Sequence, residues 1–418
     1  MSVHDELWDV AVVGAGAAGL YASIQAAKLG LKCILIERKT NIGAKILMSG
    51  GTRCNVTNLN AAADDYASEQ IRTVGSILKQ HRPDEVAGFF ASAGVEFHAE
   101  DDGRMYPSTD RAKTILDALL SECRRLKVTI VNNICIENIE RHADRFRSDS
   151  PSGSFLSKTV ILASGGLSFP TTGSDGTGFN IAKRLGHSLI ETTPSLVPLT
   201  TSDPEKYSEL AGITCKASVS GKVGAKVFVK FSGSMLFTHR GISGPIALNI
   251  SRYWLREKSA EKVFEIDFWP QQEAAWIEKY LVEAPSEKGG SHMKSLIDGF
   301  VPKKIAAFLI RQSGIKEDLK VSSLTKQQRV RLVNEIKHHR YPVSASEGYA
   351  KAEVTAGGVN LKEVNHVTME SKIQPGLFII GEMLDADGRI GGFNFQWAWS
   401  TAATAAKGVQ KCLKQSRL

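Results

Sequence analysis

The segment from Trp8 to Arg38 constrains the fold more than any other part of the chain. It reads WDVAVVGAGAAGLYASIQAAKLGLKCILIER. The valine-rich run over 8–13 predicts a parallel strand that is buried on both faces. A helix is expected over 17–29, ended by Gly30, and the apolar run over 31–36 predicts the next strand. This strand–helix–strand order is typical of a Rossmann-like α/β fold.

Three glycines join the first strand to the helix in the spacing GxGxxG, at Gly14, Gly16 and Gly19. Gly14 is expected to make the tight turn, Gly16 to let the backbone approach a pyrophosphate, and Gly19 to let the helix pack closely on the strand. Glu37 ends the second strand, where an acid accepts both hydroxyls of an adenosine ribose. The pattern predicts a dinucleotide site, and the charge of Glu37 disfavours a 2′-phosphate there.

Later segments favour FAD over a nicotinamide dinucleotide. The stretch KILMSGGTRCNVTN, from Lys45 to Asn58, follows the second strand with glycines that let backbone amides contact a flat polar group. Two glycine-rich stretches come far downstream, TVILASGGLSFPTTGSDGTGFNIAKRLGH and PGLFIIGEMLDADGRIGGFNFQWAWSTAATAAKG. The second predicts a strand over 377–380 and a long helix that opens at Gly391–Gly392. Extended FAD needs such a returning segment, because a helix N-terminus stabilises negative charge on the reduced flavin.

These blocks together resemble the BaiN-like family of bacterial FAD-dependent oxidoreductases. The resemblance rests on GAGAAGL, SGGTRCNVTN, THRGISGP, TAGGV and GGFNFQWAWS, in that order, and runs from about Val10 to Gly408. It implies a glutathione-reductase-type FAD domain, Rossmann-like and built from both ends of the chain, with an inserted β-barrel-like domain and a small helical domain. The FAD contacts that it implies are Gly14, Gly16, Ala18, Gly19, Glu37, Arg38, Lys45, Ser49, Gly50, Arg53, Asn55, Thr57, Gly381, Asp385, Gly392, Phe393 and Asn394.

The chain departs from the family pattern at three positions. Thr52 stands where the family usually has a third glycine, so the backbone there lacks glycine's freedom at positive φ. Ser164 replaces a usual threonine, and Phe169 replaces an expected tyrosine. The change at Thr52 puts the local geometry of the loop in question, whereas the other two changes are mild.

The middle of the chain has a different pattern. Alternating apolar and polar residues with glycine turns predict short antiparallel strands, and three helical stretches follow Trp269–Pro270. No second GxGxxG occurs in this part, so a built-in NAD(P)H domain is not expected. We expect an FAD-binding domain over 1–190 and 354–418, an inserted β-rich domain over 191–268 and 341–353, and a small helical domain over 269–340.

Candidate catalytic residues are sought where the insert meets the FAD domain. His239 can move protons near neutral pH and Arg240 can hold a carbonyl or carboxylate, although both could simply bond backbone carbonyls at a hinge. Arg104 and Arg389 are further cations expected to face the pocket. Cys54 has no partner thiol nearby and is expected to be a buried structural residue. His338 and His339 have no third ligand nearby, so we expect a solvated helix end and no metal site.

Composition limits the partners. The formal charge of +8 suits an anionic partner, but the basic residues are spread along the chain without a block, so a nucleic acid is not favoured. Six scattered cysteines and an acidic N-terminus without a signal-peptide pattern predict a cytoplasmic protein with reduced thiols. No membrane partner is expected, and the oligomeric state is not predicted.

Three functions remain open. The first is an FAD enzyme acting on a small molecule, which either reduces a conjugated ketone with NADH or NADPH as transient donor or oxidises a small amine. These two activities are implied by the family resemblance. The second is a flavin-dependent RNA-modifying enzyme, suggested by the net charge. The third is a flavin-binding protein without turnover.

Overall fold

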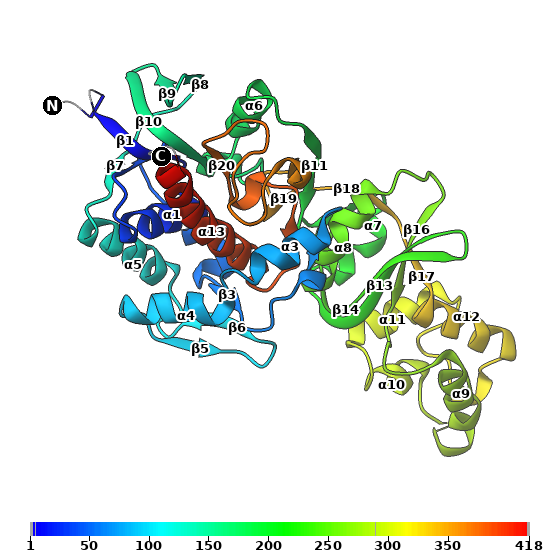
Figure 1. Cartoon of the computed structure of the whole chain (residues 1–418). Helices are drawn as coiled ribbons and strands as arrows, with labels where there is room; N and C mark the ends of the chain where they lie inside the picture. Colours follow the sequence, from blue (N-terminus) through cyan, green and yellow to red (C-terminus); the bar gives the residue numbers. More distant parts are fainter. Residues whose placement is uncertain (1–2, 5, 289, 416–418) are drawn as a thin grey trace. The chain divides into compact units, whose positions relative to one another are not determined.

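The computed structural model describes residues 3–4, 6–288 and 290–415, and the chain divides into two compact units (Figure 1). Unit 1 comprises Met1–Thr193 and Ala352–Leu418, and unit 2 comprises Pro194–Lys351. Unit 1 therefore contains both ends of the chain, as expected for an FAD domain interrupted by an insertion.

A parallel sheet forms the centre of unit 1. Its strands lie in the order β7 (Thr129–Val131), β2 (Cys33–Ile36), β1 (Leu7–Val13), β10 (Gly153–Leu162) and β20 (Leu377–Ile379). The first half of β10 also forms an antiparallel meander with β9 (Arg145–Ser150) and β8 (Asn138–His142). The valines of β1 are almost wholly buried, which explains its continuous apolar run. The carboxyl ends of β1, β10 and β20 thus lie at one edge of the sheet.

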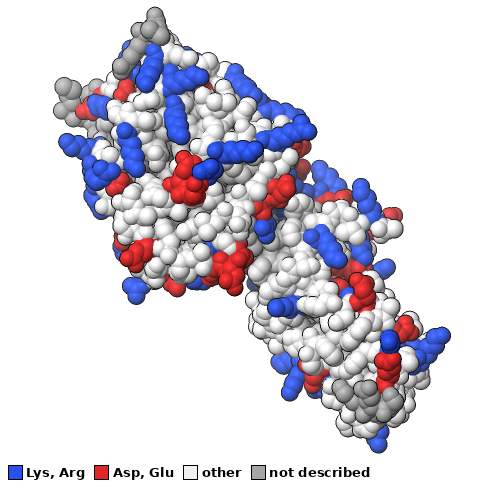
Figure 2. Space-filling view, turned by 60° about the horizontal axis from the view of Figure 1, so that its bottom comes forward, with Lys and Arg blue, Asp and Glu red and all other residues white. Residues whose placement is uncertain are grey.

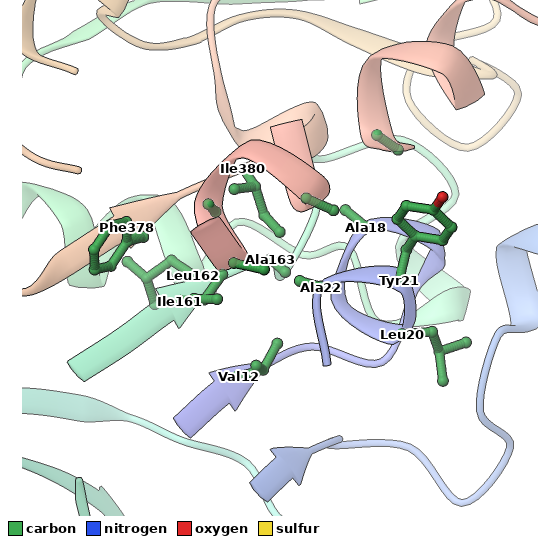
Figure 3. Close-up of a cluster of buried hydrophobic side chains, with 14 of the residues drawn as sticks. Val12, Ala18, Leu20, Tyr21, Ala22, Ile161, Leu162, Ala163, Phe378 and Ile380 are labelled. Atoms are coloured by element: carbon green, nitrogen blue, oxygen red, sulfur yellow. The ribbon is translucent and has the colours of Figure 1, made fainter. Parts of the chain in front are cut away.

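Two helices from opposite ends of the chain pack together on this sheet. They are α1 (Ala17–Lys28) and α13 (Phe393–Gln415), which lie side by side in Figure 1. Figure 3 shows how side chains of β1, α1, β10 and β20 meet in the core, among them Val12, Leu20 and Phe378. Trp397 and Trp399 of α13 are also fully buried. These aromatic residues therefore belong mainly to the packing of the C-terminal helix.

Smaller elements complete unit 1. The helices are α2 (Ala44–Met48), α3 (Ile71–Leu78), α4 (Pro83–Ser92), α5 (Ala112–Arg125) and α6 (Thr177–Arg184). The strands pair as β3 (Thr57–Asn58) with β6 (Arg104–Pro107), β6 with β5 (Phe97–Ala99), β4 (Tyr66–Ala67) with β21 (Asp387–Gly388), and β11 (Leu189–Ser195) with β19 (Val354–Val359).

Unit 2 is built on an antiparallel sheet. The order is β17 (His339–Tyr341), β16 (Lys262–Asp267), β13 (Thr214–Val223), β14 (Lys226–Phe237), β15 (Gly241–Ser243), β12 (Leu199–Thr201) and β18 (Val343–Ser346). Because β17 and β18 are consecutive in the chain yet pair with opposite edges, one segment closes the sheet on itself. This closure gives the barrel-like form that the family resemblance implies.

The helices of unit 2 share a hydrophobic core with this sheet. They are α7 (Pro204–Tyr207), α8 (Pro245–Arg256), α9 (Ala274–Lys288), α10 (Met293–Ile297), α11 (Lys303–Gln312) and α12 (Lys326–Lys337). Pro302 lies between α10 and α11. The division of this unit into a β-rich and a helical domain stays a prediction. Among the described residues, no helix is long and apolar enough to cross a membrane.

A candidate FAD site in unit 1

The glycines after β1 have three different environments. Gly14 has a φ of 105°, and a Cβ there would lie 2.6 Å from the carbonyl oxygen of Ala163. A Cβ on Gly19 would lie 1.8 Å from the carbonyl oxygen of Gly14, so α1 packs too closely for any side chain. Gly16 differs, because its φ of −79° suits any residue and no protein atom lies within 4 Å of an added Cβ. The protein itself therefore does not require glycine at position 16.

This open space lies at the N-terminus of α1. Gly16 is the N-cap residue, no side chain caps the helix, and the first turn contains no acid. The first N–H groups of a helix lack partners within it and carry a partial positive charge. A pyrophosphate fits both properties, because it is anionic and needs close approach to the backbone.

Glu37 is positioned beside the same turn. Its carboxylate accepts hydrogen bonds from the backbone N–H of Ala15 at 2.7 Å and of Lys39 at 2.8 Å. Two backbone donors fix the orientation of the carboxylate at the end of β2. A carboxylate oxygen has more than one acceptor position, so ribose hydroxyls can still donate to it.

The loop from Ser49 to Cys54 is conformationally strained. Thr52 has a φ of 74°, which is the left-handed region that the missing family glycine would have adopted freely. The preceding Gly50 and Gly51 also have positive φ, at 55° and 64°. The backbone of the loop thus has the positive φ angles that three glycines would allow, although the third of these residues is Thr52, which is β-branched.

The start of α13 approaches this loop closely. A Cβ on Gly392 would lie 2.7 Å from both the Asn55 side-chain oxygen and the Thr57 carbonyl oxygen. Within the described part of the chain, the buried Oδ1 of Asn55 has no hydrogen-bond partner. A donor on a bound group would satisfy this oxygen, which is a further point on which the residues fit a polar cofactor.

Other predicted contacts are occupied within the protein. Phe393 is buried against Tyr66, so its backbone N–H is the part of it free to meet a cofactor. Asn394 exchanges two hydrogen bonds with the backbone of Gly388. Gly381 accepts from the Trp397 indole at 3.1 Å and donates its N–H to Thr401. These bonds fix the return of the chain to the sheet edge.

The remaining predicted contacts have the following environments. Ser49 donates to the carbonyl of Ile46. Arg38 forms an ion pair with Asp175 at 2.5 Å. Ala18 and Asp385 are both buried. The assignment of these residues to FAD stays a prediction.

Lys45 lies in a polar cluster that the sequence did not reveal. Its ammonium donates to Ser168 at 2.6 Å and forms an ion pair with Glu382. Glu382 also accepts from the Ser168 hydroxyl at 2.6 Å and from the Thr355 N–H at 3.0 Å. Four segments distant in the sequence therefore meet at this point.

Glu353 completes the cluster as a half-buried carboxyl near Lys45. Burial raises the pKa of Glu353, and the positive charge of Lys45 acts in the opposite direction. Nothing local in the sequence marks which lysine Glu353 or Glu382 meets.

The four candidate catalytic residues have contrasting surroundings. Arg104 forms ion pairs with Glu100 and Asp102, at 2.7 and 2.8 Å. Arg389 forms one with Asp65 at 2.7 Å. His239 and Arg240 are exposed in unit 2, in the turn between β14 and β15. The two arginines of unit 1 are thus bound to acids, whereas the unit 2 pair is exposed.

Arg53 is also bound to acids, although it is a predicted cofactor contact. Its guanidinium pairs with Asp110 at 2.8 Å and Glu100 at 3.2 Å, and lies over the ring of Tyr106. The arginine therefore connects the strained loop to β6 and the loops beside it.

Two other expectations have clear outcomes. Cys54 is fully buried, and burial raises the pKa of its thiol to about 12, so it is a structural residue as expected. The expected solvated helix end at His338–His339 is wrong for His339. That histidine is buried between Tyr207 and Glu335, at 3.0 and 2.7 Å, because the chain enters β17 there.

The family is decided by a match over nearly the whole chain. The family model described as the HI0933-like protein Rossmann domain matches residues 8–408. The chain belongs to the HI0933-like family. A ribosomal RNA dihydrouridine synthase of Haemophilus influenzae is 35% identical over 405 residues, which is 96% of this chain and 98% of the relative.

A second relative matches equally widely. The 3-dehydro-bile acid delta(4,6)-reductase of Clostridium scindens is 33% identical over 402 residues, covering 95% of this chain and 98% of the relative. This match confirms the resemblance to the BaiN-like family. Among solved structures, a 3-ketosteroid delta1-dehydrogenase of Sterolibacterium denitrificans has a TM-score of 0.53 at 13% identity, over 97% of this chain and 99% of the other. That likeness shows a shared fold.

These findings establish the class of this HI0933-like protein. It is an FAD-dependent oxidoreductase with a Rossmann-type FAD domain. The open space at Gly16, the uncapped N-terminus of α1 and the unpaired oxygen of Asn55 are features of this chain that fit the cofactor.

Proposed function

We propose that the protein reduces a carbon–carbon double bond that is conjugated with a carbonyl group. The supporting observation is a shared chemical feature of two relatives that match almost the whole chain. One is named for forming dihydrouridine and the other for reducing delta(4,6) bonds of a 3-dehydro bile acid. Uracil C5=C6 is conjugated with a carbonyl, and so is a 4-ene beside a 3-ketone.

The reaction balances with a reduced nicotinamide as donor. Bound FAD supplies hydride transfer between the nicotinamide and carbon. The β-carbon of the substrate receives the hydride and the α-carbon receives a proton, so NADH or NADPH is oxidised while the double bond is reduced. We propose His239 as the residue that delivers this proton, and Arg240 as the group that holds the carbonyl oxygen.

The residues of unit 1 have a binding role in this proposal. The N-terminus of α1 would hold the pyrophosphate and Glu37 the adenosine ribose, and the loop from Ser49 to Thr57 would contact the flavin portion. Arg104 and Arg389, already paired with acids, are proposed to orient loops of the pocket and not to transfer protons. The ion pairs hold the two guanidinium groups in one orientation, which suits residues that position neighbouring loops.

An anaerobic flavin assay tests the reaction class. The purified holoprotein is reduced with NADH or NADPH and then mixed with a 3-keto-4-ene steroid or with uridine-containing RNA. We expect the yellow flavin absorbance to return with either type of acceptor, and the product to gain two hydrogen atoms by mass spectrometry.

Small-amine oxidation is the competing outcome. If a panel of small amines bleaches the flavin without a nicotinamide, and peroxide forms when air returns, the protein is an oxidase and the proposal fails. Flavin that no nicotinamide and no amine can reduce would instead indicate a protein that binds flavin without turnover.

A further inference from the structure

The net charge of the protein is confined to unit 2. Unit 2 contains 24 Lys and Arg against 16 Asp and Glu, a net charge of +8, which equals the charge of the whole chain. Unit 1 contains the other 28 basic and 28 acidic residues and is formally neutral. The basic residues are spread along the sequence, but only one folded unit carries their excess.

Part of this excess lies on one face of the unit 2 sheet. Ser220 of β13 pairs with Lys230 of β14 on one side and with Glu265 of β16 on the other, and Glu265 pairs with Arg340 of β17. Directly paired residues in adjacent strands share a face. Lys230, Ser220, Glu265 and Arg340 therefore form one row across four strands.

The same face continues along the strands. Side chains two residues apart share a face, so Lys216 of β13 belongs to it, opposite Ser234 of β14, and Ser232 lies between Ser234 and Lys230. We call Lys216, Lys230, Arg340, Ser232 and Ser234 the basic sheet face. The opposite face of these strands contributes residues such as Val219 and Ile266 to the core.

The acids on this face are already neutralised. Glu265 pairs with Lys222 and lies 3.1 Å from His338, and Asp267 pairs with Lys337 at 2.7 Å. Within the described residues, Lys216, Lys230 and Arg340 are exposed and have no acidic partner. Figure 2 shows Lys and Arg side chains over the side of the molecule that it presents, some of them beside Asp and Glu.

We propose that the basic sheet face binds the phosphate backbone of an RNA strand and so brings a uracil base to the enzyme. This inference rests on the proposed reduction, and it selects uracil over a steroid as the substrate of that reaction. Three unpaired cations and the neighbouring hydroxyl of Ser234 match the donors that usually contact phosphates, whereas the hydroxyl of Ser232 donates to Ser218. Three inter-strand spacings separate Lys230 from Arg340, about 14 Å, which spans several phosphates of a single strand.

Two matched triple variants of the full-length holoprotein test the proposal. The first is Lys216→Gln, Lys230→Gln and Arg340→Gln. The control is Lys183→Gln, Lys407→Gln and Lys411→Gln, which removes three exposed positive charges from unit 1. Binding of a 20-nucleotide oligouridylate is measured from 0.1 to 1 M salt, with FAD content and circular dichroism as folding checks.

We expect the first variant to bind the oligouridylate roughly 100-fold more weakly than wild type at 0.1 M salt, with convergence near 1 M. Each lost phosphate contact lowers the salt slope by about 0.7 for a single strand. The control should stay within about threefold of wild type, since only general charge is lost. Reduction of a 3-keto-4-ene steroid, as a small acceptor, should be equal in all three proteins.

Different failures are distinguishable. If both triple variants bind RNA as wild type does, the surface assignment is wrong although the reductase chemistry can stand. If wild-type protein does not bind the oligouridylate but binds vesicles containing phosphatidylserine, the partner of this face is an anionic membrane and the RNA proposal is wrong. If no conjugated acceptor is reduced while RNA binding depends on the basic sheet face, the proposed reaction fails and the RNA surface remains.

Discussion

The different surroundings of Gly16 and Gly19 predict that alanine will act differently at each. At Gly16 an added methyl group meets no protein atom within 4 Å, so it lies in space that the cofactor is proposed to use. At Gly19 the same group would lie 1.8 Å from the carbonyl oxygen of Gly14, so α1 would have to move. One substitution tests binding and the other tests packing.

The expected magnitudes follow from these contacts. Gly16→Ala changes only an N-cap residue of the apoprotein, at a cost of about 1 kcal/mol. If the methyl group keeps the pyrophosphate from two backbone N–H groups, the loss is roughly 3 kcal/mol or more, and FAD binds at least about 100-fold more weakly. Gly19→Ala overpacks the turn by up to about 3 kcal/mol, of which helix propensity returns about 1.

The assay separates the two effects. Apoprotein of each variant is titrated with FAD by flavin fluorescence, and its thermal unfolding is recorded without FAD. Gly16→Ala should give folded, nearly colourless protein, and Gly19→Ala should lower the unfolding temperature of the apoprotein further. Yellow Gly16→Ala protein with wild-type FAD affinity would refute the assignment of this turn to the pyrophosphate.

Three further predictions concern single residues. Thr52→Gly should stabilise the protein by about 1 kcal/mol in denaturant unfolding, because the relief of left-handed strain exceeds the added chain entropy; a destabilised variant would contradict this. Because the pKa of Glu353 is raised in the folded state, ionisation of this carboxyl lowers the stability of the folded protein as the pH rises above the ordinary glutamate pKa of 4.5. Glu353→Gln should therefore gain stability relative to wild type from pH 5 to 8, and parallel stability curves over that range would argue against a raised pKa. His239→Ala should lower turnover by about 100-fold and flatten the pH–rate profile near neutral pH, and an unchanged profile would remove the proton-transfer role.

Much of the FAD domain could be predicted from short stretches of sequence. The expected strand over 8–13 and helix over 17–29 correspond to β1 and α1 within one residue at each end, and the opening of the last helix at Gly391–Gly392 is confirmed. These features depend on neighbouring residues, because backbone sterics and hydrophobic periodicity act over a few positions. The geometry at Thr52, which the sequence left in question, was decided only by the structure, where its φ is positive.

Contacts between distant segments could not be predicted in the same way. Lys45 meets Ser168 and Glu382 only because the chain returns twice to one sheet edge. Arg53 and Arg389 are consistent with free ligand-binding cations in the sequence, yet the fold supplies each with acids. Ion pairing depends on positions in space to within a few ångströms, which local patterns do not contain.

The sequence by itself determined the dinucleotide fold, the glycine turn and the family, because each can be recognised from motifs of contiguous residues. Only the tertiary structure decided how charge is distributed. A total of +8 that is diffuse along the chain becomes one neutral unit and one basic unit, because the insertion folds on its own core and carries the excess, with Lys216, Lys230 and Arg340 on one sheet face. Electrostatic attraction depends on that spatial grouping and not on the order of residues along the chain.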